Sequence, residues 1–149
     1  LRRQRQMCIR DSGWTDPDNR RSYPWGKQDW ELIEFHKDMI RIHKKYECFR
    51  SGSYKSIASG SHWICYGRFN KKLQAVILIN NRREMLTVDL PIWQIGILEN
   101  ACLKRVIQTT QSTYNIGEVM ERAEDGILHV TVGPQTASVY IAARNVEEN

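Results

Sequence analysis

The sequence predicts a mainly β fold, a β-sandwich of seven to eight strands preceded by a loop and one α-helix. Two observations lead to this prediction. Apolar residues recur with a period of 3.6 over residues 26–46, and from residue 51 onward the period changes to two. Short strands at roughly ten-residue spacing, separated by turn residues, are typical of an all-β sandwich.

The composition is that of a globular protein, with 41% hydrophobic and 26% charged residues among 149. This length suffices for one core of ordinary size. No apolar run approaches the roughly 18 residues of a transmembrane helix, so we expect no membrane partner. Residues 1–12 carry +3 of the net charge of +5. The remaining +2 makes no basic face, and we expect no nucleic-acid partner.

Residues 1–12 do not share the pattern of the rest of the chain. The segment RRQRQMCIRDS has no apolar period and no helix cap, and it resembles the in-frame translation of a transposon-end adapter. We therefore interpret residues 1–12 as a non-native, adapter-derived scar and expect the native start of the protein to lie upstream. The alternative is a short native basic arm.

Residues 26–46 predict a helix of about five turns. Asp29 and Glu31 fall in its first turn and Lys44 and Lys45 in its last, as the helix dipole favours. So wide an apolar stripe must pack on something, and we expect the sandwich to cover only part of it. The stripe consists of Trp30, Leu32, Ile33, Phe35, His36, Met39, Ile40 and Ile42.

Strand candidates follow from residue 62. Residues 73–79 form a nearly continuous apolar run, which is typical of a strand buried on both faces. Asn-Asn at 80–81, Asp-Gly at 125–126 and Gly-Pro at 133–134 are turn signals. We expect the polar tail, 144–149, to be frayed. The strand candidates are 62–69, 73–79, 85–90, 103–107, 119–122, 127–132 and 137–143.

A loop that carries charges and aromatics, WTDPDNRRSYPW, occupies residues 14–25. Its two prolines hold the preceding residues extended, so the loop is predicted to be stiff. It presents Asp16, Asp18, Arg20 and Arg21. From the pattern alone a solvated turn is favoured, because an exposed ion pair contributes only about 0–1 kcal/mol.

The segment DPDNRRSYPW resembles the one that follows the eighth barrel strand in the α-amylase family, glycoside hydrolase family 13. It resembles most the neopullulanase, cyclomaltodextrinase and maltogenic amylase group. The helix, the Gly-Ser link and the strands that come next are also similar to that family's order of elements. The resemblance implies that residues 13–50 are the end of a truncated (β/α)8 catalytic barrel, with its last helix. It also implies that residues 51–143 are domain C, an antiparallel β-sandwich of Greek-key type.

The resemblance implies a retaining α-glucan hydrolase that cleaves α-glucosidic bonds in maltooligosaccharides, cyclodextrins or pullulan. The family's catalytic carboxylates lie on barrel strands that would precede this sequence, so we expect no catalytic residue in this chain and no activity from it alone. The family's substrate contacts map onto Asp16 and Arg20, whose carboxylate and guanidinium suit a vicinal diol.

Two alternatives stay open. The pair Asp16 and Arg20 could be a salt bridge that stabilises the loop. The whole chain could be a stand-alone, non-catalytic carbohydrate-binding β-sandwich, which an exposed row of aromatic residues on one sheet would favour. Tyr54, Trp63 and Tyr66 could form such a platform, although their spacing is equally that of core residues, which we favour. Trp14 and Trp25 are expected to pack and anchor the loop.

No disulfide, metal or cofactor is expected in this chain. The chain has four cysteines, and three remain once Cys8 of the adapter-derived segment is set aside. Cys48, Cys65 and Cys102 are odd in number and far apart, which favours a reducing, cytoplasmic compartment. His36 and His43 share a helix face without acidic or cysteine companions at ligand spacing. His62 and His129 are single strand residues. Calcium in an upstream part and a homodimeric parent protein are both left open.

Overall fold

A computed structural model describes residues 25–143. The chain divides into two compact units, Leu1–Glu34 and Phe35–Asn149. In the first unit the described residues form a turn and the start of helix α2, Trp30–Lys45. The Asp29 carboxylate accepts a hydrogen bond from the Leu32 backbone N–H at 3.0 Å and so caps the helix. The helix therefore begins at Trp30 rather than at residue 26, because Asp29 is its N-cap.

The second unit continues α2 and adds a short helix, α3, Cys48–Ser51. The sequence pattern had predicted a plain link here. Gly52 ends α3, and a Cβ on this residue would lie 2.3 Å from the Cys48 carbonyl oxygen and 2.9 Å from that of Phe69. Only glycine allows the chain to pass so close to both carbonyls. The Arg68 guanidinium donates hydrogen bonds to the carbonyl oxygens of Cys48, at 3.4 Å, and Phe49, at 3.1 Å.

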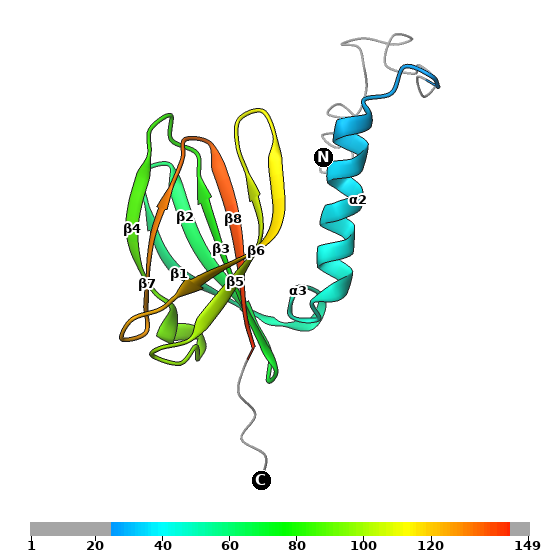
Figure 1. The fold of residues 1–149 in the computed structure, drawn as a ribbon. Coiled ribbons are helices and arrows are strands. Elements are labelled where there is room, and N and C mark those ends of the chain that lie inside the picture. Colours follow the sequence, from blue (N-terminus) through cyan, green and yellow to red (C-terminus); the bar gives the residue numbers. More distant parts are fainter. Residues whose placement is uncertain (1–24, 144–149) are drawn as a thin grey trace, which may run out of the picture. The chain divides into compact units, whose positions relative to one another are not determined.

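Eight antiparallel strands follow and form two sheets (Figure 1). The larger sheet has the order β1-β2-β3-β8-β5-β6, and β4 pairs with β7 in a sheet of two strands. The predicted mainly β, antiparallel fold with a preceding helix is confirmed. The strands are β1 Ser53–Gly60, β2 Trp63–Phe69, β3 Leu73–Asn80, β4 Leu86–Pro91, β5 Cys102–Thr109, β6 Tyr114–Arg122, β7 Ile127–Val132 and β8 Thr136–Ala143.

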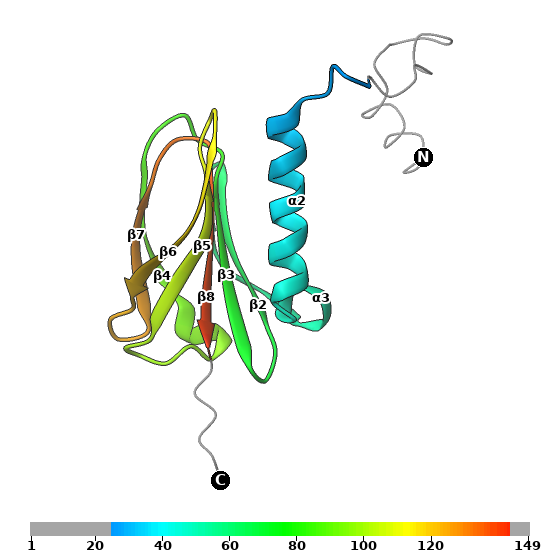
Figure 2. The ribbon, with the colours of Figure 1, turned by 45° about the vertical axis from the view of Figure 1, so that its right-hand side comes forward.

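The main core lies between the two sheets, which Figure 2 shows facing each other. Val76 and Leu78 of β3 point into it, as does Tyr140 of β8, and Leu90 and Leu128 meet them from the smaller sheet. A 3-10 helix, η2 (Ile92–Ile95), closes one end of this core with two buried isoleucines. Full burial of each such side chain contributes about 1.5–3 kcal/mol to folding.

The opposite face of the six-stranded sheet carries a second apolar cluster. Ala75 and Ile77, which alternate with the core residues of β3, lie in it with Ile141 of β8 and with Tyr46 and Cys48. The centre of this sheet is thus covered on both faces. This arrangement explains the nearly continuous apolar run of β3.

Two strands extend beyond the sequence prediction. Strand β1 was not predicted, because Ile57 is its only buried residue and an edge strand shows little alternation. Strand β6 begins at Tyr114 rather than at residue 119, and most of its residues are exposed. The predicted Asp125-Gly126 turn is confirmed by positive φ angles of 49° and 75° between the paired residues Glu124 and Ile127. No helix within residues 25–143 is long and apolar enough to cross a membrane.

Candidate functional site

The residues predicted to contact sugar, Asp16 and Arg20, lie outside the described part of the chain, as do Trp14, Asp18 and Arg21. Their roles stay predictions. Trp25 is described and exposes 81% of its surface, which differs from the expected packing role.

Two of the histidines considered as possible metal ligands contact an aromatic ring or a carboxylate instead. The His43 ring stacks on Phe49 with centroids 6.3 Å apart, and His129 Nδ1 lies 2.6 Å from an oxygen of Asp89. Among the described residues, no three His, Cys, Asp or Glu side chains are grouped so that they could hold a metal ion. Cys48, Cys65 and Cys102 are free thiols.

The three aromatic residues considered as a sugar platform do not share one surface. Trp63 packs against the core between the sheets, whereas Tyr66 packs on the opposite face of the larger sheet. Tyr54 lies beside Tyr66 with ring centroids 5.4 Å apart and is 57% exposed. The core interpretation therefore holds for Trp63 and Tyr66 and is wrong for Tyr54. A row of all three is excluded by the alternation of β2.

The helix and the larger sheet meet at a junction built from four side chains. Phe35 lies edge-on to Tyr114 with ring centroids 5.0 Å apart, and Ile42 packs on the second cluster one turn beyond Asp38. The Tyr114 hydroxyl donates a hydrogen bond of 2.9 Å to Asp38 Oδ2. Asp38 also pairs with Arg41 on the helix. Sequence reasoning found the apolar members, whereas the Asp38 contact depends on a strand 76 residues away.

Part of the same helix is uncovered. Met39 and Ile40 are 38% and 52% exposed, and none of the residues of α2 is fully buried. This agrees with the expectation that the β-region covers only part of the apolar stripe. The junction can thus hold the helix against the sheet while a second apolar strip stays accessible.

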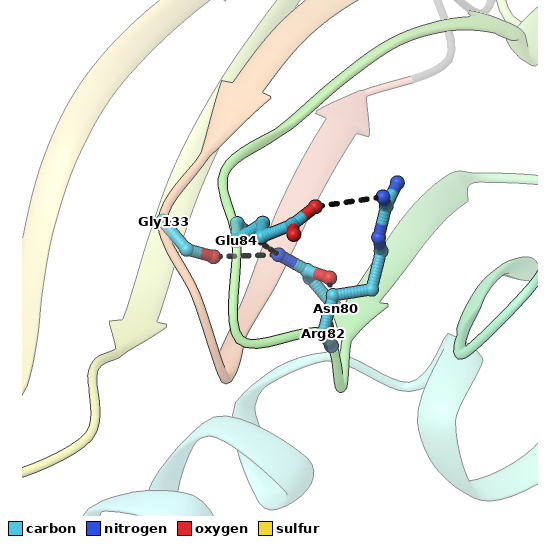
Figure 3. A network of polar contacts seen from close by, with 4 residues as sticks. All are labelled: Asn80, Arg82, Glu84 and Gly133. Carbon is cyan, nitrogen blue, oxygen red and sulfur yellow. Dashed lines mark hydrogen bonds and ion pairs between the residues drawn. The ribbon is translucent and has the colours of Figure 1, made fainter.

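A polar network locks the loop that joins β3 to β4 (Figure 3). Asn80, almost fully buried, donates hydrogen bonds from its amide nitrogen to the carbonyl oxygens of Glu84, at 3.0 Å, and Gly133, at 2.7 Å. Its amide oxygen accepts one from the Arg82 backbone N–H at 3.0 Å. Arg82 Nη2 lies 3.1 Å from Glu84 Oε2. Sequence reasoning had read Asn80 only as a turn signal.

Burial raises the pKa values of two thiols and two phenols. Desolvation raises the pKa of Cys65 to about 12, and it also raises the pKa values of Cys48, Tyr66 and Tyr140. These groups stay protonated near neutral pH and are poor nucleophiles there. Their shifts reflect core packing rather than chemistry at a site.

Known proteins of similar sequence match part of this chain. The amylopullulanase of Thermoanaerobacter thermohydrosulfuricus is 33% identical over 57 residues, which are 38% of this chain. The cyclomaltodextrinase of Geobacillus thermopakistaniensis (strain MAS1) is 27% identical over 96 residues, or 58% of this chain. The chain matches part of α-amylase family proteins. It spans only 4% and 16% of these two relatives' lengths.

The fold agrees with that relation to the α-amylase family. The structure of an α-amylase from Geobacillus thermoleovorans, complexed with acarbose, superposes with a TM-score of 0.72 and 23% identity. The match covers 90% of this chain and 27% of that one, and the fold is that of a C-terminal region of α-amylase structures. The sequence resemblance is thus confirmed as a partial match to α-amylase family proteins. No protein-family model matches the chain.

Proposed function

We propose that this chain is the C-terminal part of a retaining α-glucan hydrolase of the α-amylase family. In this proposal residues 13–50 are the end of its (β/α)8 barrel and residues 51–143 are a support domain. One observation carries the proposal: 90% of the chain superposes on 27% of an α-amylase. The rest of such an enzyme would include the remainder of the barrel.

The helix–sheet junction agrees with a role of residues 51–143 as a support domain for a barrel. Phe35 and Ile42 fix one side of α2 to the second cluster, and the Tyr114–Asp38 hydrogen bond fixes the register between helix and strand β6. Met39 and Ile40 stay exposed, although burial of such side chains is favourable. A helix whose other apolar strip faces a barrel satisfies both observations.

The substrate follows from the relatives and from the loop chemistry. The related proteins are named for pullulan and cyclomaltodextrin, and a structural neighbour binds acarbose. We propose that the parent enzyme cleaves α-glucosidic bonds in maltooligosaccharides, cyclodextrins or pullulan. Asp16 and Arg20 would hydrogen-bond adjacent hydroxyls of a glucose unit, with the carboxylate accepting and the guanidinium donating.

Catalysis requires groups that this chain is not proposed to supply. Retaining hydrolysis needs two carboxyl groups about 5–5.5 Å apart, and in (β/α)8 barrels they stand at the carboxyl ends of strands. We therefore expect the purified 149-residue chain to leave pullulan and cyclodextrin uncleaved in a reducing-sugar assay. Hydrolysis by the chain alone would contradict this assignment.

The sugar contacts are tested in the extended enzyme with the upstream reading frame restored. Changing Arg20→Ala should lower kcat/KM on maltotriose-sized substrates about 10–100-fold, because hydrogen bonds from a charged donor are lost. Arg122→Ala, an exposed arginine on β6, is the matched control. Equal kinetics for both variants would remove the role of Arg20.

The alternative, a stand-alone carbohydrate-binding module, predicts an exposed aromatic row on one sheet. Trp63 and Tyr66 instead lie on opposite faces of the larger sheet. That alternative also does not explain why Met39 and Ile40 on α2 are exposed. The hydrolase proposal accounts for both.

A further inference from the structure

Strand β6 forms one edge of the six-stranded sheet, and among the strands of residues 25–143 only β5 pairs with it. It is nine residues long and contains neither lysine nor proline. Such residues commonly protect edge strands, because unpaired backbone N–H and C=O groups can pair with another chain. All residues of β6 except Tyr114 and Glu121 are exposed. Three of the exposed residues are large and apolar, namely Ile116 (51%), Val119 (46%) and Met120 (58%).

The opposite edge of the same sheet, β1, is tied to the rest of the sandwich. Lys55 of β1 donates a hydrogen bond to the Gln94 carbonyl oxygen of η2 at 3.2 Å. Strand β1 also contacts β4 and η2 along the chain's smaller sheet. The two edges therefore differ, and β6 is the one that is open to a further strand.

The charges on β6 restrict how a second strand could pair with it. Glu118 forms an ion pair with Lys104 of β5, and Glu121 forms one with Arg105, with Oε1 and Nη1 3.3 Å apart. Within the described part of the chain, Arg122 has neither an ion pair nor a side-chain hydrogen bond. The edge thus presents one unmatched cation beside two carboxylates.

A second copy of the same strand complements these charges in one register. Two copies that pair antiparallel are related by a two-fold axis, so a single residue at the axis faces itself. An axis at Met120 places Glu118 opposite Arg122 of the second copy, and this happens twice. An axis at Glu118 would place two carboxylates opposite each other, which is destabilising. An axis at Val119 would place Arg122 opposite Ile116 and form no ion pair.

The surrounding structure leaves the stretch around Met120 accessible. Helix α2 is joined to β6 by the hydrogen bond between Asp38 and Tyr114, which is the first residue of the strand. The register between β5 and β6 is regular from Arg122 to Val119. A strand paired around Met120 would therefore extend a regular part of the sheet, away from the helix–sheet junction.

We propose that two copies of this chain associate through β6, with Met120 of each copy at a two-fold axis. Backbone hydrogen bonds would join residues 118–122 of the copies, and two ion pairs between Glu118 and Arg122 would flank the contact between the methionines. Stable interfaces usually involve about 20–30 residues a side, so we expect a weak dimer that forms at high protein concentration. This inference concerns the β-region alone and does not rest on the proposed function.

Sedimentation equilibrium of the full 149-residue chain over a range of concentrations measures the association. Glu118→Arg and Arg122→Glu should each raise Kd about tenfold or more, because each variant places two like-charged pairs across the axis. An equimolar mixture of the two variants should associate again, because each facing pair then joins opposite charges. Arg83→Glu, a charge reversal at an exposed position of the β3–β4 loop, is the matched control and should leave Kd unchanged.

The position of the axis is tested by cross-linking with copper–phenanthroline as the oxidant. Met120→Cys, in a Cys102→Ala background that lacks the exposed thiol, should form a disulfide between copies. Directly opposite residues of antiparallel strands have Cα atoms about 4.5–5.5 Å apart, which suits a disulfide. Asn115→Cys in the same background is the control and should stay uncross-linked, because this register holds the two copies of that residue far apart.

Several results would overturn the proposal. These are a wild-type chain that stays monomeric at the highest attainable concentration, an Arg122→Glu variant that associates as the wild type does, and a mixture of variants that stays monomeric. Equal weakening by Arg83→Glu would also contradict it. Association that is lost in Ile40→Gln and unaffected by the β6 variants would place the contact on α2 instead. Unchanged circular dichroism will show that the variants are folded.

Discussion

The Tyr114 hydroxyl donates a 2.9 Å hydrogen bond to Asp38 Oδ2 and so joins the first residue of β6 to the middle of helix α2. The Phe35 ring lies against the same tyrosine. A single aromatic residue at a strand end therefore gives the helix both an apolar and a polar contact. Both contacts tie residues 35–38 of α2 to strand β6.

Replacing Tyr114→Phe should keep the ring contact and remove the hydrogen bond. We expect a loss of about 1.5–3 kcal/mol in the free energy of unfolding, because the lost hydrogen bond has a charged and largely buried acceptor. Urea denaturation followed by circular dichroism measures this loss. Tyr54→Phe, at a tyrosine that is 57% exposed, is the control and should change stability by less than about 0.5 kcal/mol. Equal effects in the two variants would show that the hydroxyl does not anchor the helix.

Asn80→Ala should be among the costliest polar substitutions in the described chain. It removes two donated hydrogen bonds and one accepted bond in a buried position, for an expected loss of about 3 kcal/mol. Thermal unfolding measures the effect. Asn115→Ala, on the exposed strand β6, should cost less than about 0.5 kcal/mol. A small effect at Asn80 would mean that water replaces its partners.

Stability should fall in alkaline solution partly through Cys65. Burial raises its pKa to about 12 from an ordinary value of 9.0, so between these values the folded state holds a proton that the unfolded state has lost. The contribution is complete below pH 9 and decreases as the pH rises toward 12. Tyr66 and Tyr140 act in the same direction.

Cys65→Ala should therefore flatten the dependence of unfolding free energy on pH over this range, whatever its effect at neutral pH. The slope should change by up to one proton, or about 1.4 kcal/mol per pH unit. Cys102→Ala, which removes an exposed thiol, is the matched control. Identical slopes in all three proteins would refute a buried, protonated Cys65.

The two sides of α2 should respond differently to mutation. Ile42→Ala removes a side chain that packs on the second cluster and should cost about 1–2 kcal/mol, less than a fully buried isoleucine. Ile40→Gln replaces a 52% exposed residue and should change stability by less than about 0.5 kcal/mol in this chain. In the extended enzyme the same Ile40→Gln should become destabilising if a barrel covers it. Unfolding in both proteins, followed by tryptophan fluorescence, tests this.

The regular part of the fold could be predicted because its residues show their environment locally. Val76 and Leu78 alternate with Ala75 and Ile77, and both sets are apolar, which indicates a strand covered on both faces. The Asp125-Gly126 turn was predictable because its residues tolerate positive φ. Strand β1 was not, since an edge strand needs only one buried residue, here Ile57.

The candidate sites also include one that was visible in the local sequence and others that were not. The family relation was visible in the sequence of the loop that contains Asp16 and Arg20. A hollow lined by Trp63 and Arg83 was not visible, because these residues are 20 positions apart, one at the start of β2 and the other in the β3–β4 loop. Asn80 was visible as a turn residue, but its bond to Gly133 spans 53 positions.

The sequence by itself determined the succession of one long helix and then strands, the mainly β class and the partial match to α-amylase family proteins, since periodicity and short motifs are local properties of a chain. Only the tertiary structure decided which strands became neighbours, which side of α2 was covered and which polar loops met in a hollow. These outcomes depend on contacts between distant residues, such as Tyr114 with Asp38, and such contacts form only when sheet register brings their backbones together.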